Sequence, residues 1–278
     1  DSLIISGDLD VNDGTIKLDG NYPVGTGNVA LGNAALDDGS LSGNFNTAMG
    51  NNVLTANTSG AQNTAYGAAA MQTNTTGANN TALGGNGPLQ ANTSGGSNTA
   101  VGYSALFSNT TASENVAVGY QALYDNTTGA KNTAVGTAAL TNNTTASNNS
   151  AFGREALKYN TTGASNVAVG REALVSNTTA SENTAVGYQA AYSTTTGVSN
   201  SALGWRSFYT NTTGIQNVAL GERALYLNTT GSYNVSVGMD SLYSNTTASN
   251  NTAVGYKALY TNTTGSENAG LSDAALQL

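Results

Sequence analysis

The chain has 278 residues, of which only 9% are charged, and its 8 basic and 16 acidic side chains give a net charge of −8. Nucleic acid binding depends on clustered Lys and Arg, so this balance disfavours a nucleic acid partner. The chain contains no Cys and no His, which excludes disulfides, zinc–thiolate sites and imidazole acid–base catalysis. No stretch approaches the roughly 18 consecutive apolar residues of a membrane span, so we expect no membrane insertion.

Residues 1–27 differ in pattern from the rest of the chain. Apolar and polar residues alternate from Leu3 to Leu18, and Asn12-Asp13-Gly14 is typical of a turn. We expect two or three short strands that form an N-terminal β cap or the end of a preceding shaft segment. The acidic residues here also permit a calcium-loop interpretation, but Gly14 lies one place late for it, and a plain turn is favoured. Without a starting Met or a visible signal peptide, the chain is interpreted as a processed or excerpted piece.

Residues 28–278 repeat a single unit that opens with an asparagine. The unit is seventeen residues long, with two upstream steps of eighteen, and the array holds fifteen copies. A period of this length is the signature of a solenoid. We number positions in each copy from this asparagine, so Asn115 is position 1, Gly119 position 5 and Leu123 position 9. The opening asparagines are Asn28, Asn46, Asn63, Asn80, Asn98, Asn115, Asn132, Asn149, Asn166, Asn183, Asn200, Asn217, Asn234, Asn251 and Asn268.

The residue types within each copy predict an all-β fold. Position 5 is Gly in fourteen copies, position 4 is a large apolar residue and position 9 is usually Leu. The glycine and the Asn-Thr-Thr turn signal in each copy leave no segment long enough for a stable helix. We predict a parallel β-solenoid or β-roll of about fifteen 17-residue coils with two short extended segments per coil. At about 4.8 Å per coil the rod is about 70 Å long, and the opening asparagines form an amide ladder along it. The ladder positions that carry the fold are Asn115, Val118, Gly119, Leu123, Asn132, Val135, Gly136 and Leu140.

Positions 3 and 4 predict how the coils associate. Position 3 is Ala in most copies and position 4 is commonly Val or Leu, and adjacent strand residues point to opposite faces. A strand that is apolar on both faces has both faces covered. We therefore expect the larger residues to fill the coil and the Ala face to pack against another copy of the chain, in a homotrimer or a filament.

The motif Asn-Thr-Ala-Val-Gly-Tyr-Gln-Ala from Asn183 to Ala190 resembles the head-domain repeat of trimeric autotransporter adhesins. Arrays with Asn-Thr-Thr-Gly spacers are also similar to tail-fibre proteins of bacterial viruses. The resemblance covers nearly all of residues 28–278, and it implies a left-handed parallel β-roll, three chains side by side and an extracellular or virion-surface location. The period of this chain is longer than the family's usual one, and the extra residues lie in the Asn-Thr-Thr turn.

No catalytic, metal or cofactor site is expected, and the chain is not interpreted as an enzyme. Carboxylates are scattered singly, and glycoside hydrolysis needs two that converge. Glu155 and Glu172 share position 7 in adjacent copies, but Arg154 and Arg171 flank them, which predicts a charge cluster on a solvated edge. The recurrent glycines are expected to serve the coil rather than a ligand.

Aromatic residues recur at positions 6 and 10. An exposed row at position 6, comprising Tyr120, Tyr188, Trp205 and Tyr256, is a possible stacking surface for the sugar rings of a receptor. The favoured interpretation is packing between neighbouring coils or subunits with the hydroxyls in water, because repetition alone produces such rows.

The Asn-Thr-Thr and Asn-Thr-Ser turns carry two further hypotheses. Each is a formal N-glycosylation acceptor on a turn expected at the surface, but the favoured interpretation is that Asn and Thr are simply good turn residues. Paired threonines such as Thr127 and Thr128 also suggest ice binding, but only one of the two can face outward, which makes a poor lattice. The possible acceptors are Asn57, Asn74, Asn92, Asn109, Asn126, Asn143, Asn160, Asn177, Asn211, Asn228, Asn245 and Asn262.

These observations favour a structural and adhesive fibre segment, from a viral tail fibre used in host attachment or a bacterial surface adhesin. Such a rod holds a receptor-binding tip away from the particle, and several parallel chains multiply weak contacts. The expected partners are copies of the chain itself and a cell-surface glycan or protein receptor. The alternative is a glycosylated extracellular filament protein, and an ice-binding solenoid is less favoured.

Overall fold

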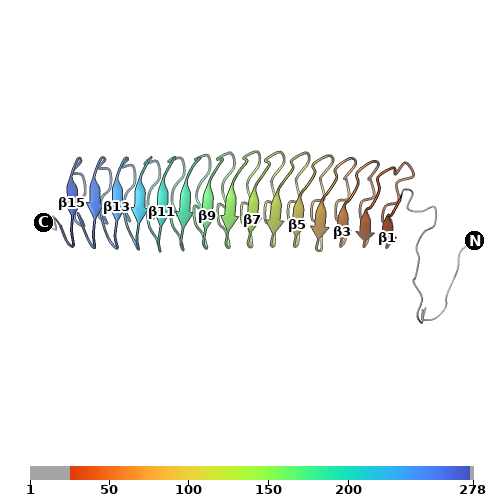
Figure 1. Ribbon diagram of the computed structural model, residues 1–278, viewed down its shortest axis with the longest axis horizontal. Coiled ribbons are helices and arrows are strands. Elements are labelled where there is room, and N and C mark those ends of the chain that lie inside the picture. Colours follow the sequence, from red (N-terminus) through yellow and green to blue (C-terminus); the bar gives the residue numbers. More distant parts are fainter. Residues whose placement is uncertain (1–25, 276–278) are drawn as a thin grey trace, which may run out of the picture.

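A computed structural model describes residues 26–275, which form a rod of fifteen three-residue strands without a helix (Figure 1). The N-terminal strands expected in residues 1–27 fall almost entirely outside the described residues. The strands are β1 Val29–Leu31, β2 Thr47–Met49, β3 Thr64–Tyr66, β4 Thr81–Leu83, β5 Thr99–Val101, β6 Val116–Val118, β7 Thr133–Val135, β8 Ser150–Phe152, β9 Val167–Val169, β10 Thr184–Val186, β11 Ser201–Leu203, β12 Val218–Leu220, β13 Val235–Val237, β14 Thr252–Val254 and β15 Ala269–Leu271.

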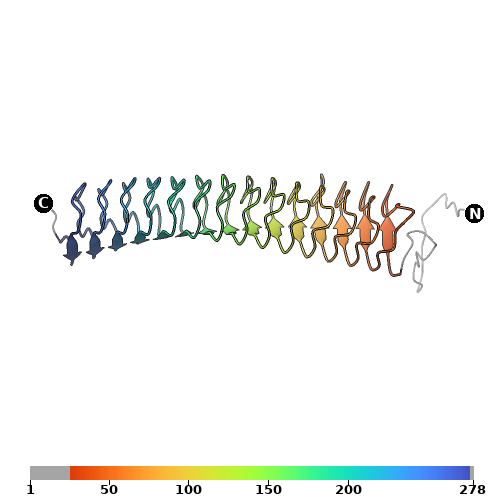
Figure 2. The same cartoon turned by 90° about the horizontal axis from the view of Figure 1, so that it is seen from above.

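All fifteen strands belong to one parallel sheet in which each strand pairs with the next along the chain. The register follows the repeat, so that Ala117 of β6 lies opposite Ala134 of β7. We name each coil after its strand. The strands line one side of the rod and the turns lie opposite (Figure 2). The predicted all-β parallel solenoid, with one coil for each repeat of the sequence, is therefore confirmed.

Each coil holds one strand, so the prediction of two extended segments is wrong. Gln121 at position 7 and Leu123 at position 9 both have a φ of 53°, a left-handed conformation that turns the chain sharply and is incompatible with an extended strand. Position 17 turns in the same way, as at Lys131 with a φ of 60°. The turned segments still bond to adjacent coils, since the Leu123 amide donates to the Ala139 carbonyl at 3.0 Å.

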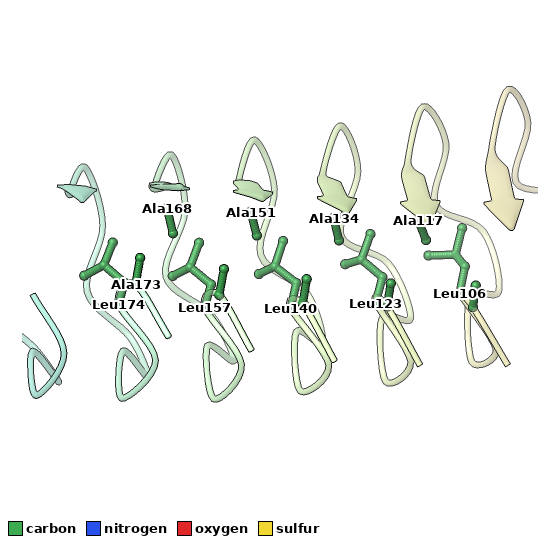
Figure 3. Packing of buried hydrophobic residues seen from close by; sticks show 14 of the residues in the cluster. Leu106, Ala117, Leu123, Ala134, Leu140, Ala151, Leu157, Ala168, Ala173 and Leu174 are labelled. Carbon is green, nitrogen blue, oxygen red and sulfur yellow. The ribbon is translucent and has the colours of Figure 1, made fainter. Parts of the chain in front are cut away.

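The core is narrow and is filled by alanines and leucines. Ala117 of the strand points inward toward the column of leucines at position 9 (Figure 3), and Ala117, Ala122 and Leu123 are fully buried. Val118 and Val135 at position 4 point outward and stay partly exposed. The expectation that the larger strand residues fill the coil is therefore wrong. Two buried residues from positions 8 and 9 of each coil already occupy the interior, and the strand adds only a methyl group.

Glycine at position 5 is required by the stacking of the coils. Gly119 has a φ of +136°, and a Cβ on it would lie 2.6 Å from the carbonyl oxygen of Gly136 in the next coil. A side chain there would meet both backbone strain and a backbone clash. The glycine ladder thus serves the fold, as the sequence indicated.

Candidate functional site

The opening asparagines form the predicted amide ladder, which we call the first Asn ladder. The backbone N–H of Asn132 donates to Asn115 Oδ1 at 2.9 Å, and that of Asn115 donates to Asn98 Oδ1 at 3.0 Å. Asn115 Nδ2 also crosses its own coil to donate to the Gly129 carbonyl at 2.9 Å. The side chain of Asn115 is fully buried, so each asparagine both joins two coils and closes one.

The asparagines at position 12 form a second Asn ladder that sequence reasoning missed. Asn126 Nδ2 donates to Asn109 Oδ1 at 3.0 Å and to the Gly129 carbonyl at 2.9 Å. The Gly129 carbonyl therefore accepts from both ladders and holds the two ends of the coil together. The recurrence of Asn at this position was the available signal, because a solvated turn tolerates several residue types whereas a buried ladder needs one.

The same asparagines are the possible glycosylation acceptors, and their side chains do not lie at the surface. Eleven of the twelve are fully buried, and Asn262 in the coil of β14 is partly buried. Asn126 Nδ2 is typical, since it uses both of its hydrogens within the rod. A glycan on this nitrogen would displace hydrogen bonds that hold adjacent coils together.

The paired threonines that follow have different environments. Thr127 Oγ1 donates to the Thr144 carbonyl of the next coil at 3.0 Å, whereas Thr128 is exposed. This arrangement repeats along the rod, and the prediction that only one threonine of each pair faces outward is confirmed. The exposed hydroxyls form a single column along the turn side.

The aromatic residues pack from coil to coil, as the sequence favoured. At position 10, Tyr192, Tyr209, Tyr226, Tyr243 and Tyr260 form a continuous stack with ring centroids 5.1–5.2 Å apart. Burial raises the pKa of Tyr209 and of Tyr243.

At position 6, Tyr120 stacks on Tyr103 at 5.3 Å. Tyr120, Trp205 and Tyr256 are 49%, 42% and 43% exposed, and Tyr188 is half-buried. This row is therefore more accessible to a ligand than the stacked rings at position 10.

Position 7 carries a polar chain along the edge beside the aromatic rows. Arg154 and Arg171 contact Glu155 and Glu172 at 3.2 Å and 2.9 Å, which confirms the expected charge cluster. Glu172 is nearly buried, and hydrogen bonds from Gln189 and then from Arg171 hold its pKa below the ordinary value.

Farther along the same edge, the carboxylate of Asp240 is buried and accepts a hydrogen bond from Arg223 Nη2 at 2.9 Å. Each of these carboxylates is bound by its own cation, so the position-7 chain is a set of ion pairs.

The outward side of the sheet carries only uncharged side chains, and we call positions 2 and 4 of all coils the outer sheet face. Position 4 is a large apolar residue in every coil, with Tyr66, Leu203 and Phe152 exposed by 55%, 50% and 41%. Position 2 is Thr, Val, Ser or Ala throughout. The fold ladder residues Val118 and Val135 belong to this face rather than to the core.

Residues 26–275 hold no group of three potential metal-ligating side chains. Over the same range no helix has the length and apolar character needed to cross a membrane. Comparison of the chain with protein-family models, with curated proteins and with solved structures finds no match. The resemblance to adhesin and tail-fibre repeats therefore depends on the motif alone. What the chain can bind is determined by the surfaces described above.

Proposed function

We propose that this chain is a structural and adhesive segment of an extracellular or virion-surface fibre, and that it works as a homotrimer. The observation that carries the proposal is the outer sheet face, which is uncharged over fifteen strands and presents a large apolar residue in every coil. Soluble monomers rarely expose a contiguous apolar patch of more than a few hundred Å². The strand alanines, which the sequence pattern predicts to meet the partner, are buried in the core of the single chain instead.

The size of the outer sheet face suits an interface between copies. Fifteen strands at about 4.8 Å and three residues at about 3.3 Å give roughly 700 Å². A standard stable interface buries about 800 Å² per partner. The first Asn ladder and the glycine contacts run from coil to coil along the whole described rod, and the second Asn ladder runs from Asn57 with an interruption at Thr194. Such a trimer would therefore be stiff along its length, as a rod that holds a distal tip requires.

Two alternatives have less support from the geometry. A glycosylated filament would need sugar on asparagines whose amide hydrogens are already used within the rod. After expression in a glycosylating host, the intact mass should therefore stay near the 27.9 kDa of the bare chain. Ice binding would depend on a single exposed threonine column, so we expect no thermal hysteresis.

Sedimentation velocity tests the proposal. The wild-type chain should sediment as a species of about three times the 27.9 kDa chain mass. The paired substitution Val118→Glu with Val135→Lys keeps the net charge and places ions on the outer sheet face, so it should give monomers with an unchanged circular dichroism spectrum. The matched pair Thr128→Glu with Thr145→Lys, on the exposed threonine column, should leave the trimer intact. A wild-type chain that stays monomeric at 100 µM would overturn the proposal.

A further inference from the structure

Basic side chains gather on one edge of an otherwise acidic rod. Six of the 8 basic residues of the chain lie at positions 6, 7 and 10 of the coils of β8 to β14, namely Arg154, Lys158, Arg171, Arg206, Arg223 and Lys257. Most of them are paired, since Arg154 and Lys158 contact Glu155, Arg171 contacts Glu172, and Arg223 contacts Asp240. These pairs account for the charge at four of the six residues.

Arg206 and Lys257 are the two that have no carboxylate partner among residues 26–275, and of these only Arg206 is a guanidinium. Its Nε donates to Gln189 Oε1 at 2.8 Å. A guanidinium carries five N–H donors, so its two terminal nitrogens remain to meet an acceptor from outside the chain.

Aromatic rings surround this unpaired cation. The Cζ of Arg206 lies 4.7 Å from the ring centroid of Trp205, 5.3 Å from that of Tyr209 and 5.9 Å from that of Tyr188. Arg171 approaches Tyr188 from the preceding coil at 5.8 Å. Two guanidinium groups thus approach one tyrosine, and one of them also lies against an exposed indole, an arrangement that no other part of the described rod repeats.

A hydrogen-bonded chain fixes the orientation of Arg206. Arg171 Nε donates to Glu172 Oε1 at 2.9 Å, and Gln189 Nε2 donates to Glu172 Oε2 at 2.6 Å. The amide oxygen of Gln189 is thereby turned toward Arg206 and accepts the hydrogen bond from Arg206 Nε at 2.8 Å. Glu172 and Gln189 are 9% and 7% exposed, so the chain is largely shielded from water and holds the guanidinium before any ligand arrives.

We infer that Arg171, Tyr188, Trp205 and Arg206 form a binding surface for an anionic saccharide, which we call the Arg–aromatic surface. The C–H face of a sugar ring packs on the Trp205 indole, while a carboxylate or sulfate on that sugar pairs with the terminal nitrogens of Arg206. A nucleic acid fits less well, because a longer polymer with a phosphate at every unit would extend past the two arginines onto a rod with a net charge of −8.

The inference deepens the adhesive part of the proposed function and places a receptor contact on the side of the rod. It does not require the homotrimer, and the two ideas can fail separately. Because three chains would present three such surfaces, weak binding at each would be multiplied in the assembled fibre.

Trp205 is the single tryptophan of the chain, so its fluorescence reports on this surface directly. Titration with tetragalacturonate or with a heparin-derived tetrasaccharide should give a saturable change, with maltotetraose as the uncharged comparison. The first probe carries carboxylates and the second also sulfates, so the two titrations distinguish the anionic groups. Arg206→Gln should weaken binding at least tenfold. The affinity of Arg206→Lys should lie between those of Arg206→Gln and the wild type, because Lys keeps the charge but lacks the two parallel donors of the guanidinium.

Two variants serve as matched controls. Lys131→Gln removes the same charge from the opposite edge of the strand, and Tyr120→Leu removes an aromatic at the same repeat position that has no neighbouring arginine. Both should bind as the wild type does. Circular dichroism melts of every variant show whether the rod is intact, and sedimentation of the same samples reports the oligomeric state independently.

The inference is overturned if neither anionic tetrasaccharide changes the fluorescence up to 10 mM. It is also overturned if maltotetraose binds equally well, if Arg206→Gln in a folded rod binds as tightly as the wild type, or if a tetranucleotide binds more tightly than both saccharides. If the chain forms a trimer that does not bind the saccharides, only the Arg–aromatic surface is contradicted. If it is a monomer that binds them, only the homotrimer is contradicted.

Discussion

The coil of β10 and the coils before it differ in the second Asn ladder. From Asn74 to Asn177 the side-chain amide of each asparagine donates to the asparagine one coil earlier, beginning with Asn57 as the first acceptor. The coil of β10 has Thr194 instead, and within the described residues neither the Thr194 hydroxyl nor Asn177 Oδ1 finds a hydrogen-bond partner. One coil later Asn211 turns its amide, so that Oδ1 accepts from the Gly214 N–H at 3.0 Å.

The backbone continues through this interruption unchanged. The Thr195 amide donates to the Thr212 carbonyl at 3.0 Å, and the turn bond from the Thr194 amide to the Ala191 carbonyl is kept at 3.2 Å. The geometry of the coil is therefore set by backbone stacking and by glycine, and the second Asn ladder adds stability to a shape already determined. Substitutions in each of these features should separate the two contributions.

The largest effect should come from the backbone contact that both kinds of coil share. Gly119→Ala places a methyl 2.6 Å from the Gly136 carbonyl oxygen at a φ of +136°, so we expect the free energy of unfolding to fall by about 4 kcal/mol or folding to fail. Urea unfolding followed by circular dichroism measures it. Gly39→Ala is the control, because nothing lies within 4 Å of its added methyl. An equal, small effect at both positions would contradict the role given to the glycine ladder.

Asn126→Thr copies the interruption into an intact coil. It removes the bonds from Asn126 Nδ2 to Asn109 Oδ1 and to Gly129, and it leaves a buried acceptor unpaired, so we expect a loss of about 2 kcal/mol. The neighbouring Asn142→Thr, at a position outside both ladders, should change stability by less than about 0.5 kcal/mol. If the two variants melt alike, the second ladder contributes nothing.

Thr194→Asn repairs the interruption and should stabilise the rod. The new amide gives Asn177 Oδ1 the donor it lacks, but Asn211 must give up its bond with the Gly214 N–H. The net gain is therefore about 1 kcal/mol, or a rise in Tm of about 3 °C. Thr196→Asn, at the exposed position of the same coil, should leave Tm unchanged in the same differential scanning calorimetry series. A repaired chain that melts lower than the wild type would reverse the interpretation.

The smallest effect should be the pH dependence of the position-7 chain. Hydrogen bonds from Gln189 and Arg171 lower the pKa of Glu172 from its ordinary value of 4.5. A lowered pKa gives stability that is present above pH 4.5 and is lost as the pH falls through the folded value. Between pH 5 and pH 3, the Tm of the wild type should therefore fall more than that of Glu172→Gln. If the Tm of the two proteins falls equally between pH 5 and pH 3, ionisation of Glu172 contributes nothing to stability.

Much of the rod was predictable from the sequence. The regular period specifies parallel coils. The Gly at position 5, such as Gly119, specifies a close contact between coils, and the Asn at position 1, such as Asn115, specifies an amide ladder. Each of these features depends only on stacking like residues on like, which repetition guarantees.

The orientation of the strand was not predictable by the same means. Ala117 and Val118 are both apolar, so alternation alone leaves inside and outside ambiguous. The orientation is determined by the left-handed backbone of Gln121 and Leu123. This turn places Ala122 and Leu123 in the core beneath the strand, where the remaining space holds only the methyl group of Ala117. Neither residue type favours positive φ, so the sequence carries little sign of this turn.

The candidate sites divide in the same way. The exposure of Trp205 followed from its place in the aromatic row, but the route from Glu172 through Gln189 to Arg206 crosses three coils and depends on the register. The Asn-Thr-Thr turn signal predicts a surface position for Asn126. Its burial follows from the carbonyl of Gly129, which lies inside the loop and receives both ladders.

The most direct measurement is thiol labelling of two single-cysteine variants, since the chain has no native cysteine. Ala117→Cys should resist a small maleimide at every protein concentration, because its side chain lies in the core. Val118→Cys, on the outer sheet face, should react rapidly in dilute monomer and become protected as the concentration rises and the chains associate. Rapid labelling of Ala117→Cys, or protection of Val118→Cys at every dilution, would contradict the account.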